Sequence, residues 1–249
     1  MRLTVLGFQS PYPGPGGATA GYLLQTDLVN ILIDCGSGVI SQLTKLVPAF
    51  ELDALLLSHY HHDHVADLGV LQYGLMAHQS MGDRAKDAPL AVYAPAETQN
   101  QAVGITYKSA TMHHVIDEND EIVIGDVVVR FFCTDHPVEC YGMRIEHNGK
   151  TIIYGADTGP NVKWPSYAKG ADLFICEGTY LESNKPADLS VMGHMTVGLA
   201  AEAAEQLEAK EFWITHLWPA YTEERVLAEA KAYRSGTCRV AQIGLSKEF

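Results

Sequence analysis

The segment from Ser58 to His64, with the sequence SHYHHDH, constrains the fold more than any other part of this 249-residue chain. It follows the apolar run Leu55–Leu57, and a short apolar run bounded by polar residues is typical of a buried strand. Residues 65–73 then carry apolar side chains at helical spacing. We therefore expect a strand that ends in a tight turn into a helix, with polar side chains gathered at the edge of a sheet.

The polar segment has the side chains of a metal site, in the spacing H-x-H-x-D-H. Side chains alternate along an extended chain, so His59 and His61 can point to the same side, toward one ion. The turn can direct Asp63 and His64 toward a second ion. Imidazole nitrogens and carboxylate oxygens are ligands that zinc-type ions bind. Structural zinc sites usually have four closed ligands, often cysteines. Because no cysteine lies nearby in the sequence, an open catalytic site is favoured.

Composition excludes several classes of function. No apolar run approaches the length of about 18 residues expected of a membrane span, and the first residues lack the features of a signal peptide. The five cysteines are scattered without a C-x-x-C pair, which is typical of reduced thiols. We therefore expect a cytoplasmic protein that does not bind a membrane. The formal net charge of -13 disfavours stable binding of long nucleic acid, which needs a basic face.

The first half of the chain is rich in predicted hairpins, and the last third alternates strands with helices. Two sheets packed face to face with helices outside accommodate both patterns. This predicts an α/β (α+β) fold in a single domain of residues 1–249. The polar stretch 79–88 is expected to be a surface loop, with a mobile lid as the alternative. Strands are expected at 2–6, 22–25, 31–34, 90–93, 122–124, 127–133, 140–147, 150–154, 172–176, 212–215 and 239–241, and helices at 39–47, 95–103, 197–210 and 222–233.

Residues of ligand type recur where the predicted strands end. His136, Asp157 and His216 each follow a strand, and sites in layered α/β folds form where strand ends converge. Together with the ligands of the 58–64 segment, these residues suffice for two metal ions that share a ligand. Asp34 also ends a strand. We expect it to cap the following helix, to steady a metal-ligand histidine, or both.

On these motifs the chain resembles the metallo-β-lactamase superfamily, and within it the ribonuclease Z-like phosphodiesterases. The resemblance implies a four-layer αββα sandwich, two Zn²⁺ ions with Mn²⁺ or Fe²⁺ as alternatives, and a homodimer. It implies that His59, His61 and His136 bind the first ion, that Asp63, His64 and His216 bind the second, and that Asp157 bridges them. The motifs are Asp34 in IDCGSG, the H-x-H-x-D-H loop, His136, Asp157 in YGADTG and His216 in ITHLWP.

Two further residues look like those of the phosphodiesterase subgroup: Glu177 in LFICEGT and His194 in GHMT. The resemblance implies that His194, held by Glu177, contacts the phosphate or assists the leaving group. It also implies that Asp63 orients a metal-bridging hydroxide. Ribonuclease Z carries a tRNA-binding arm between the segments that match His136 and Asp157. Here only a short hairpin separates them, which argues against tRNA processing.

We therefore expect a binuclear zinc-dependent hydrolase that cleaves a small or cyclic phosphodiester or a short oligonucleotide. One alternative is a carbon-ester or thioester hydrolase, of the lactonase or glyoxalase-like kind, that uses the same metals on a carbonyl group. Another is a non-catalytic metal-binding protein. That interpretation predicts the loss of at least one ligand, and all seven are present in the sequence.

Overall fold

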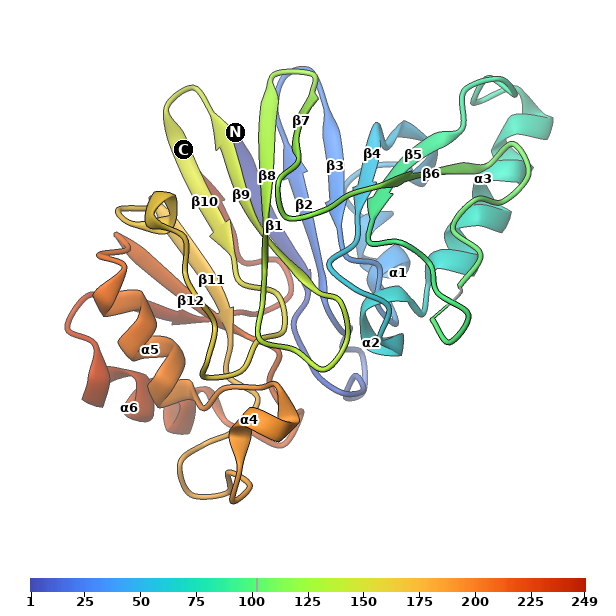
Figure 1. Cartoon of the computed structure of the whole chain (residues 1–249). Coiled ribbons are helices and arrows are strands. Elements are labelled where there is room, and N and C mark those ends of the chain that lie inside the picture. The colour runs from blue at the N-terminus through green and yellow to red at the C-terminus, as the bar shows by residue number, and fades with distance from the viewer. Residues whose placement is uncertain (102) are drawn as a thin grey trace. The chain divides into compact units, whose positions relative to one another are not determined.

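The chain is described by a computed structural model that covers residues 1–101 and 103–249 (Figure 1). These residues form two compact units, each with its own mixed β-sheet. Unit 1 comprises residues 1–116, 124–126 and 242–249, and unit 2 comprises residues 117–123 and 127–241. The assignment of the chain to a single domain stays a prediction. Among the described residues, no helix combines the length and the apolar character needed to cross a bilayer.

Unit 1 contains a seven-stranded sheet in the order β14-β1-β2-β3-β4-β5-β6. Neighbouring strands run antiparallel from β14 to β3 and parallel from β3 to β6. The helices are α1 (Val39–Leu43), α2 (His62–Val65) and α3 (Leu68–Met81), with a 3-10 turn at Ala49–Glu51. The strands are β1 (Arg2–Gly7), β2 (Gly21–Gln25), β3 (Asn30–Ile33), β4 (Ala54–Leu56), β5 (Leu90–Ala94), β6 (Thr111–Val115) and β14 (Ser246–Glu248).

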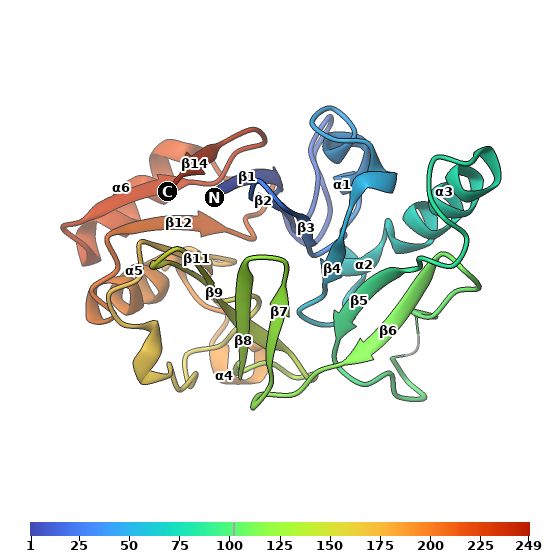
Figure 2. The same ribbon diagram turned by 90° about the horizontal axis from the view of Figure 1, so that it is seen from above.

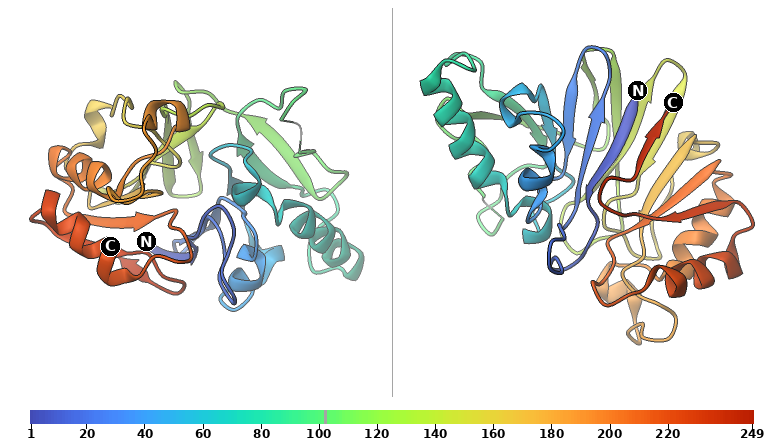
Figure 3. Two further views of the ribbon diagram at one scale, coloured as in Figure 1. Left: turned by 90° about the horizontal axis from the view of Figure 1, so that it is seen from below. Right: turned by 180° about the vertical axis from the view of Figure 1, so that it is seen from behind.

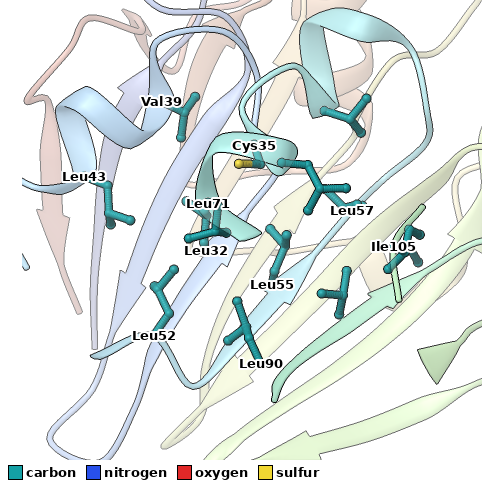
Figure 4. Packing of buried hydrophobic residues seen from close by; sticks show 14 of the residues in the cluster. Leu32, Cys35, Val39, Leu43, Leu52, Leu55, Leu57, Leu71, Leu90 and Ile105 are labelled. Carbon is teal, nitrogen blue, oxygen red and sulfur yellow. The ribbon is translucent and has the colours of Figure 1, made fainter. Parts of the chain in front are cut away.

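The core of unit 1 fixes the turn that carries the ligand segment. In α3, Leu68, Leu71 and Leu75 recur at helical spacing and are buried. They pack in one cluster with Leu32 of β3 and Leu55 of β4, as Figure 4 shows for Leu32, Leu55 and Leu71. Each buried leucine contributes about 1.5–3 kcal/mol relative to an exposed one. Because β4 and α3 are both anchored in this core, the residues between them are held at the end of β4.

Unit 2 contains the second seven-stranded sheet, in the order β13-β12-β11-β10-β9-β8-β7. Strands β10 to β13 are parallel, whereas β8, β9 and β10 are antiparallel. The β9–β10 hairpin turns at Asn148 and Gly149, whose φ angles of 49° and 73° confirm the two-residue turn predicted from this dipeptide. The strands are β7 (Glu121–Ile124), β8 (Val127–Cys133), β9 (Tyr141–His147), β10 (Lys150–Tyr154), β11 (Leu173–Glu177), β12 (Glu211–Thr215) and β13 (Thr237–Val240).

Helices α5 (Val197–Gln206) and α6 (Glu223–Tyr233) lie together against the parallel part of this sheet, as Figures 1, 2 and 3 show. Helix α5 contacts β11 and β12, and α6 contacts α5 and β13. The small buried side chains of Ala200, Ala201 and Ala204 allow α5 to approach the strands closely. Helix α4 (Leu189–Met192) and a 3-10 turn at Ser166–Ala168 lie in the connecting segments. Because β10, β11 and β12 are parallel, their carboxyl ends lie at one edge of the sheet.

Several sequence predictions about secondary structure are wrong. The helix predicted at 95–103 is absent from residues 95–101 and 103; residue 102 lies outside the described residues. The carboxylate of Glu97 accepts hydrogen bonds from the amides of Val103 and Gly104 at 2.6 and 2.7 Å, which stabilises a loop instead of a helix. Helix α1 ends at Leu43, short of the predicted residue 47, and strands β6 and β14 were not predicted.

The polar stretch 79–88 is not a loop throughout, because α3 continues to Met81. Beyond the helix, the guanidinium of Arg84 donates hydrogen bonds to the carbonyl oxygens of Phe50 and Leu52 at 2.7 and 2.9 Å. These bonds tie the segment to the rest of unit 1. The lid remains an untested alternative.

Candidate metal centre

In unit 1, the buried carboxylate of Asp34 organises the ligand segment. Asp34 directly follows β3 and Ser58 lies beyond the end of β4, and these two strands are parallel neighbours. Oδ1 of Asp34 accepts hydrogen bonds from the amide of Ser58 at 2.8 Å and from its Oγ at 3.0 Å. Oδ2 of Asp34 lies 2.8 Å from Nδ1 of His64. Asp34 does not cap α1, because the N-cap position is Gly38 and the amide of Ile40 in the first turn donates to Oδ2 of Asp67 instead, at 3.0 Å.

The rings of His61 and His64 both lie close to the ring of His59. The ring centroid of His59 lies 4.7 Å from that of His61 and 4.2 Å from that of His64. Asp63, in the single turn of α2, accepts a hydrogen bond from Oγ of Ser10 at 2.9 Å. The Gly/Pro-rich segment 9–17, which follows β1 and contains Ser10, therefore contacts a predicted ligand.

Gly36 allows the turn after β3 to approach this segment. A Cβ atom at this position would lie 2.0 Å from the carbonyl oxygen of Asp63 and 2.2 Å from Oγ1 of Thr19. Such a Cβ atom could not be accommodated without a shift of the backbone. The glycine in IDCGSG is therefore required by close packing against the ligand segment.

In unit 2, the predicted residues converge at the edge where β10, β11 and β12 end. Asp157 follows β10, Glu177 ends β11 and His216 follows β12. One ligand atom from each of Asp157, His194 and His216 lies within 4.8 Å of the others. Oδ2 of Asp157 is 3.2 Å from Nε2 of His216. Within this unit, Asp157 and His216 lie together where the strand-end argument made from the sequence places them.

Strained backbone marks the same strand ends. Asp34, Ala156 and His216 have φ angles of 55°, 50° and 57°. Residues other than glycine seldom adopt this left-handed conformation, which costs of order 1–3 kcal/mol. Each of these residues either is a predicted site residue or precedes one. The left-handed conformation changes the direction of the backbone at the strand end, next to a predicted ligand.

The imidazoles of His136 and His216 are held through Nδ1. Nδ1 of His136 donates to the carbonyl oxygen of Gly193 at 2.9 Å, and Nδ1 of His216 lies 2.8 Å from Oγ1 of Thr179. Burial lowers the pKa of His136 below its ordinary value, although Asp157 opposes the shift. A neutral imidazole is the form that binds a metal ion.

His194 is paired with the fully buried Glu177, whose Oε1 lies 2.9 Å from Nδ1 of the imidazole. Burial by itself lowers the pKa of His194, but the charge and the hydrogen bond of Glu177 outweigh burial and raise the pKa above its ordinary value. The rings of His194 and His216 stack with their centroids 5.3 Å apart. His194 therefore offers a cationic or hydrogen-bonding group beside the ligand atoms.

The donor set fits zinc-type ions. His59, His64, His136 and His216 all engage a protein partner through Nδ1, which leaves Nε2 as the atom that can face an ion. Metal-binding histidines in proteins are typically oriented by a hydrogen bond of this kind from the other ring nitrogen. Hence each unit carries a set of oriented nitrogen and oxygen ligands.

The structure also identifies residues of the site that the sequence analysis did not select. Ser58 and Ser10 bond to Asp34 and Asp63, and the carbonyl of Gly193 orients His136. Thr179 bonds to both Glu177 and His216. For Ser58, Thr179 and Gly193 the only signal available in the sequence was their position next to a predicted motif, as in SHYH, EGT and GHM, whereas Ser10 lies next to none of these motifs.

Comparisons with known proteins define the family. Residues 29–217 match the family model described as "Beta-lactamase superfamily domain". The chain belongs to the beta-lactamase superfamily. Its relatives are named metallo-hydrolase and ribonuclease Z, and the chain is a metallo-hydrolase of this superfamily. The resemblance inferred from the sequence is thereby confirmed.

Within the superfamily, the chain is 34% identical over 244 residues to YhfI of Bacillus subtilis, which is named "probable metallo-hydrolase". The alignment covers 98% of each chain. The crystal structure of YhfI, described as a metallo-beta-lactamase fold protein, superposes with a TM-score of 0.91 over 100% of this chain and 99% of YhfI. This similarity confirms the predicted fold class, the α/β sandwich of the metallo-β-lactamase type.

Two further similarities are more distant. The chain is 27% identical to a ribonuclease Z of Lachnoclostridium phytofermentans, over 93% of this chain and 92% of that protein. A diphosphatase from the PhnP family has a TM-score of 0.74 at 19% identity, over 100% of this chain and 97% of that protein. The second similarity concerns the fold alone.

Proposed function

We propose that this metallo-hydrolase is a binuclear zinc-dependent phosphodiesterase that acts on a small or cyclic phosphodiester or a short oligonucleotide. The observation that carries the proposal is the His194–Glu177 pair, which lies beside the potential ligand atoms of Asp157 and His216. The name of the ribonuclease Z relative, which implies a phosphodiester as its substrate, supports phosphorus chemistry.

On the proposed assignment, His59, His61 and His136 hold one ion, Asp63, His64 and His216 hold the other, and Asp157 is shared. The nitrogen and oxygen donors of the two units, each oriented by buried partners, support this assignment. When bound, two such ions supply Lewis acidity and lower the pKa of a coordinated water toward about 7.

The side chains of the chain then move protons and position the substrate. Asp63, oriented by Ser10, accepts the proton of the attacking water. His194 donates from Nε2 to the leaving oxygen or to the charge that develops on the phosphoryl group, while Glu177 holds its Nδ1. The raised pKa of His194 favours the protonated form that this donation requires.

A carbon-ester or thioester hydrolase remains the alternative, because the same ligand set can act on a carbonyl group. On a carbonyl substrate, bound ions would supply the Lewis acidity, and a proton donor in the position of His194 would not be required. The net charge of -13 supports a small substrate over long nucleic acid, because the surface repels an extended phosphate backbone.

The test is turnover of bis(p-nitrophenyl) phosphate by zinc- or manganese-loaded protein, compared with a lactone and a thioester at equal enzyme concentration. We expect turnover of the diester and at least a tenfold lower rate for His194→Ala at the same metal content. His147→Ala, at the β9–β10 turn, is the matched histidine control and should retain the rate. Inertness toward the diester together with turnover of the lactone or thioester would refute the proposal.

A further inference from the structure

The hydroxyl group of Thr179 lies between the two buried groups that organise unit 2. Oγ1 of Thr179 is 2.5 Å from Oε2 of Glu177 and 2.8 Å from Nδ1 of His216. Thr179 is 5% exposed, and Glu177 is fully buried. The three groups therefore form a chain of hydrogen bonds that is shielded from water.

The direction of each bond in this chain follows from counting donors. Oε1 of Glu177 accepts from the amide of Thr158 and from Nδ1 of His194, and Oε2 also accepts from the amide of Met195. A carboxylate surrounded by donors can only accept, so the single hydroxyl proton of Thr179 is donated to Glu177. Thr179 must then accept from His216, which places the imidazole proton on Nδ1 and the lone pair on Nε2.

Unit 1 contains the same arrangement. Asp34 bonds directly to Nδ1 of His64, and it also accepts from Oγ of Ser58, which lies 3.0 Å from Nδ1 of His59. In each unit a buried carboxylate therefore holds one histidine directly and a second histidine through a hydroxyl group. Thr179 is the counterpart of Ser58, although the two lie in unrelated sequence motifs.

We propose that Thr179 is a positioning residue that fixes the tautomer of His216 and so links the metal-ligand role of His216 to the carboxylate that holds His194. The hydroxyl group keeps Nε2 of His216 free of a proton and directed toward Asp157, 3.2 Å away. Glu177 thus orients the imidazole of His194 directly and that of His216 through Thr179, and these two rings stack beside Asp157.

Loss of the hydroxyl group has a specific consequence. Without an acceptor at Nδ1, His216 can carry its proton on Nε2 and donate it to Oδ2 of Asp157. That hydrogen bond would engage Nε2 of His216 and Oδ2 of Asp157, which are the atoms proposed to bind the ion. Metal affinity should then fall even though every ligand is still present. The expected loss of zinc affinity rests on the proposed function, in which His216 is a metal ligand. The expected position of the proton on the His216 ring does not depend on that function.

The experiment compares Thr179→Val, which keeps the shape of the side chain but lacks the hydroxyl group, with Thr179→Ser, which keeps the hydroxyl group. Thr111→Val removes a buried hydroxyl from unit 1, where it donates to the carbonyl of Ile105, and is the matched control. Zinc affinity is measured by chelator competition. The tautomer of His216 is read from imidazole ¹⁵N shifts of the metal-free protein, with a His216→Gln spectrum for assignment.

We expect Nδ1-protonated His216 in the wild type and in Thr179→Ser. In Thr179→Val we expect loss of that signal and about a 10- to 100-fold loss in affinity for one of two zinc equivalents. An Nε2-protonated His216 in the wild type would overturn the proposal, and this result does not depend on how any variant folds. Wild-type zinc affinity in Thr179→Val, or an equal loss in Thr179→Ser, would overturn it as well. Failure of the wild type to bind zinc would instead count against the proposed function.

Discussion

Nδ1 of His64 lies 2.8 Å from Oδ2 of Asp34, and neither side chain is exposed to solvent. The strands that precede these residues, β3 and β4, are parallel neighbours. The pair therefore connects the topology of the sheet directly to the orientation of a predicted ligand. Since Asp34 also accepts from Ser58, which contacts His59, one carboxylate orients two of the four ligands in this segment.

Asp34→Asn should weaken zinc binding without unfolding the protein. The amide retains the shape of the carboxylate, but its NH₂ group must face either Ser58 or His64, where an acceptor is needed. We expect a loss of about 10- to 100-fold in zinc affinity by chelator competition. Asp53→Asn changes a carboxylate that accepts from the amide of Asn30, and it should leave the affinity unchanged. Equal affinities for Asp34→Asn and the wild type would contradict this account of Asp34.

The neighbours His61 and His62 should differ sharply in their effect on metal binding. His61 packs toward His59, whereas His62 is exposed. Zinc at 100 times its Kd should stabilise the wild type by about 2.7 kcal/mol. We expect His61→Ala to lose most of this stabilisation and His62→Ala to keep it, as measured by urea unfolding with and without zinc. If His62→Ala lost the stabilisation and His61→Ala kept it, then His62 and not His61 would be the metal ligand.

The His194–Glu177 pair should make the stability of the metal-free protein depend on pH. The pKa of His194 in the folded state lies above its ordinary value of 6.5 because Glu177 outweighs the effect of burial. The pair therefore contributes fully below about pH 6.5 and loses its contribution as the pH rises through the folded-state pKa. The difference in unfolding free energy between the wild type and His194→Gln should shrink over that range. In a Glu177→Gln background the pH dependence should disappear, and its persistence there would assign it to another group.

Two glycine-to-alanine substitutions should change stability in opposite directions. Gly36→Ala places a Cβ atom 2.0 Å from the carbonyl oxygen of Asp63, so the backbone must shift. We expect Gly36→Ala to lower the free energy of unfolding by about 1–3 kcal/mol or more, which is the usual cost of overpacking. In the middle of α3, Gly74→Ala meets no atom within 4 Å and should gain about 0.5–1 kcal/mol. Urea unfolding midpoints measure both effects, and a neutral Gly36→Ala would contradict the close packing.

Some parts of the site were predictable because they depend on local patterns. An apolar run followed by H-x-H-x-D-H places four ligands at a strand end, and strand ends in one parallel sheet meet at one edge. The partner of Asp34 was harder to predict, because a carboxylate after a strand is equally suited to a helix cap. The register of β3 against β4 places Asp34 beside Ser58, and that pairing is not encoded in any local motif.

Other features could not be read from the sequence. The left-handed backbone at Ala156 could not be predicted, since alanine disfavours that conformation in isolation. Thr179 reads as an ordinary buried threonine until Glu177 and His216 are seen on either side of it. Strand β6 was missed because its sequence, TMHHV, lacks a clear alternation of apolar and polar residues.

The most direct test of the central claim is a zinc titration of the metal-free protein with bis(p-nitrophenyl) phosphate as substrate. The account predicts no turnover without metal and a rate that rises to a plateau at two zinc equivalents per chain. In His216→Ala, the same titration should leave a rate at least tenfold lower at every ratio of zinc to protein. Turnover by the metal-free protein, or full activity at one equivalent, would contradict a binuclear phosphodiesterase.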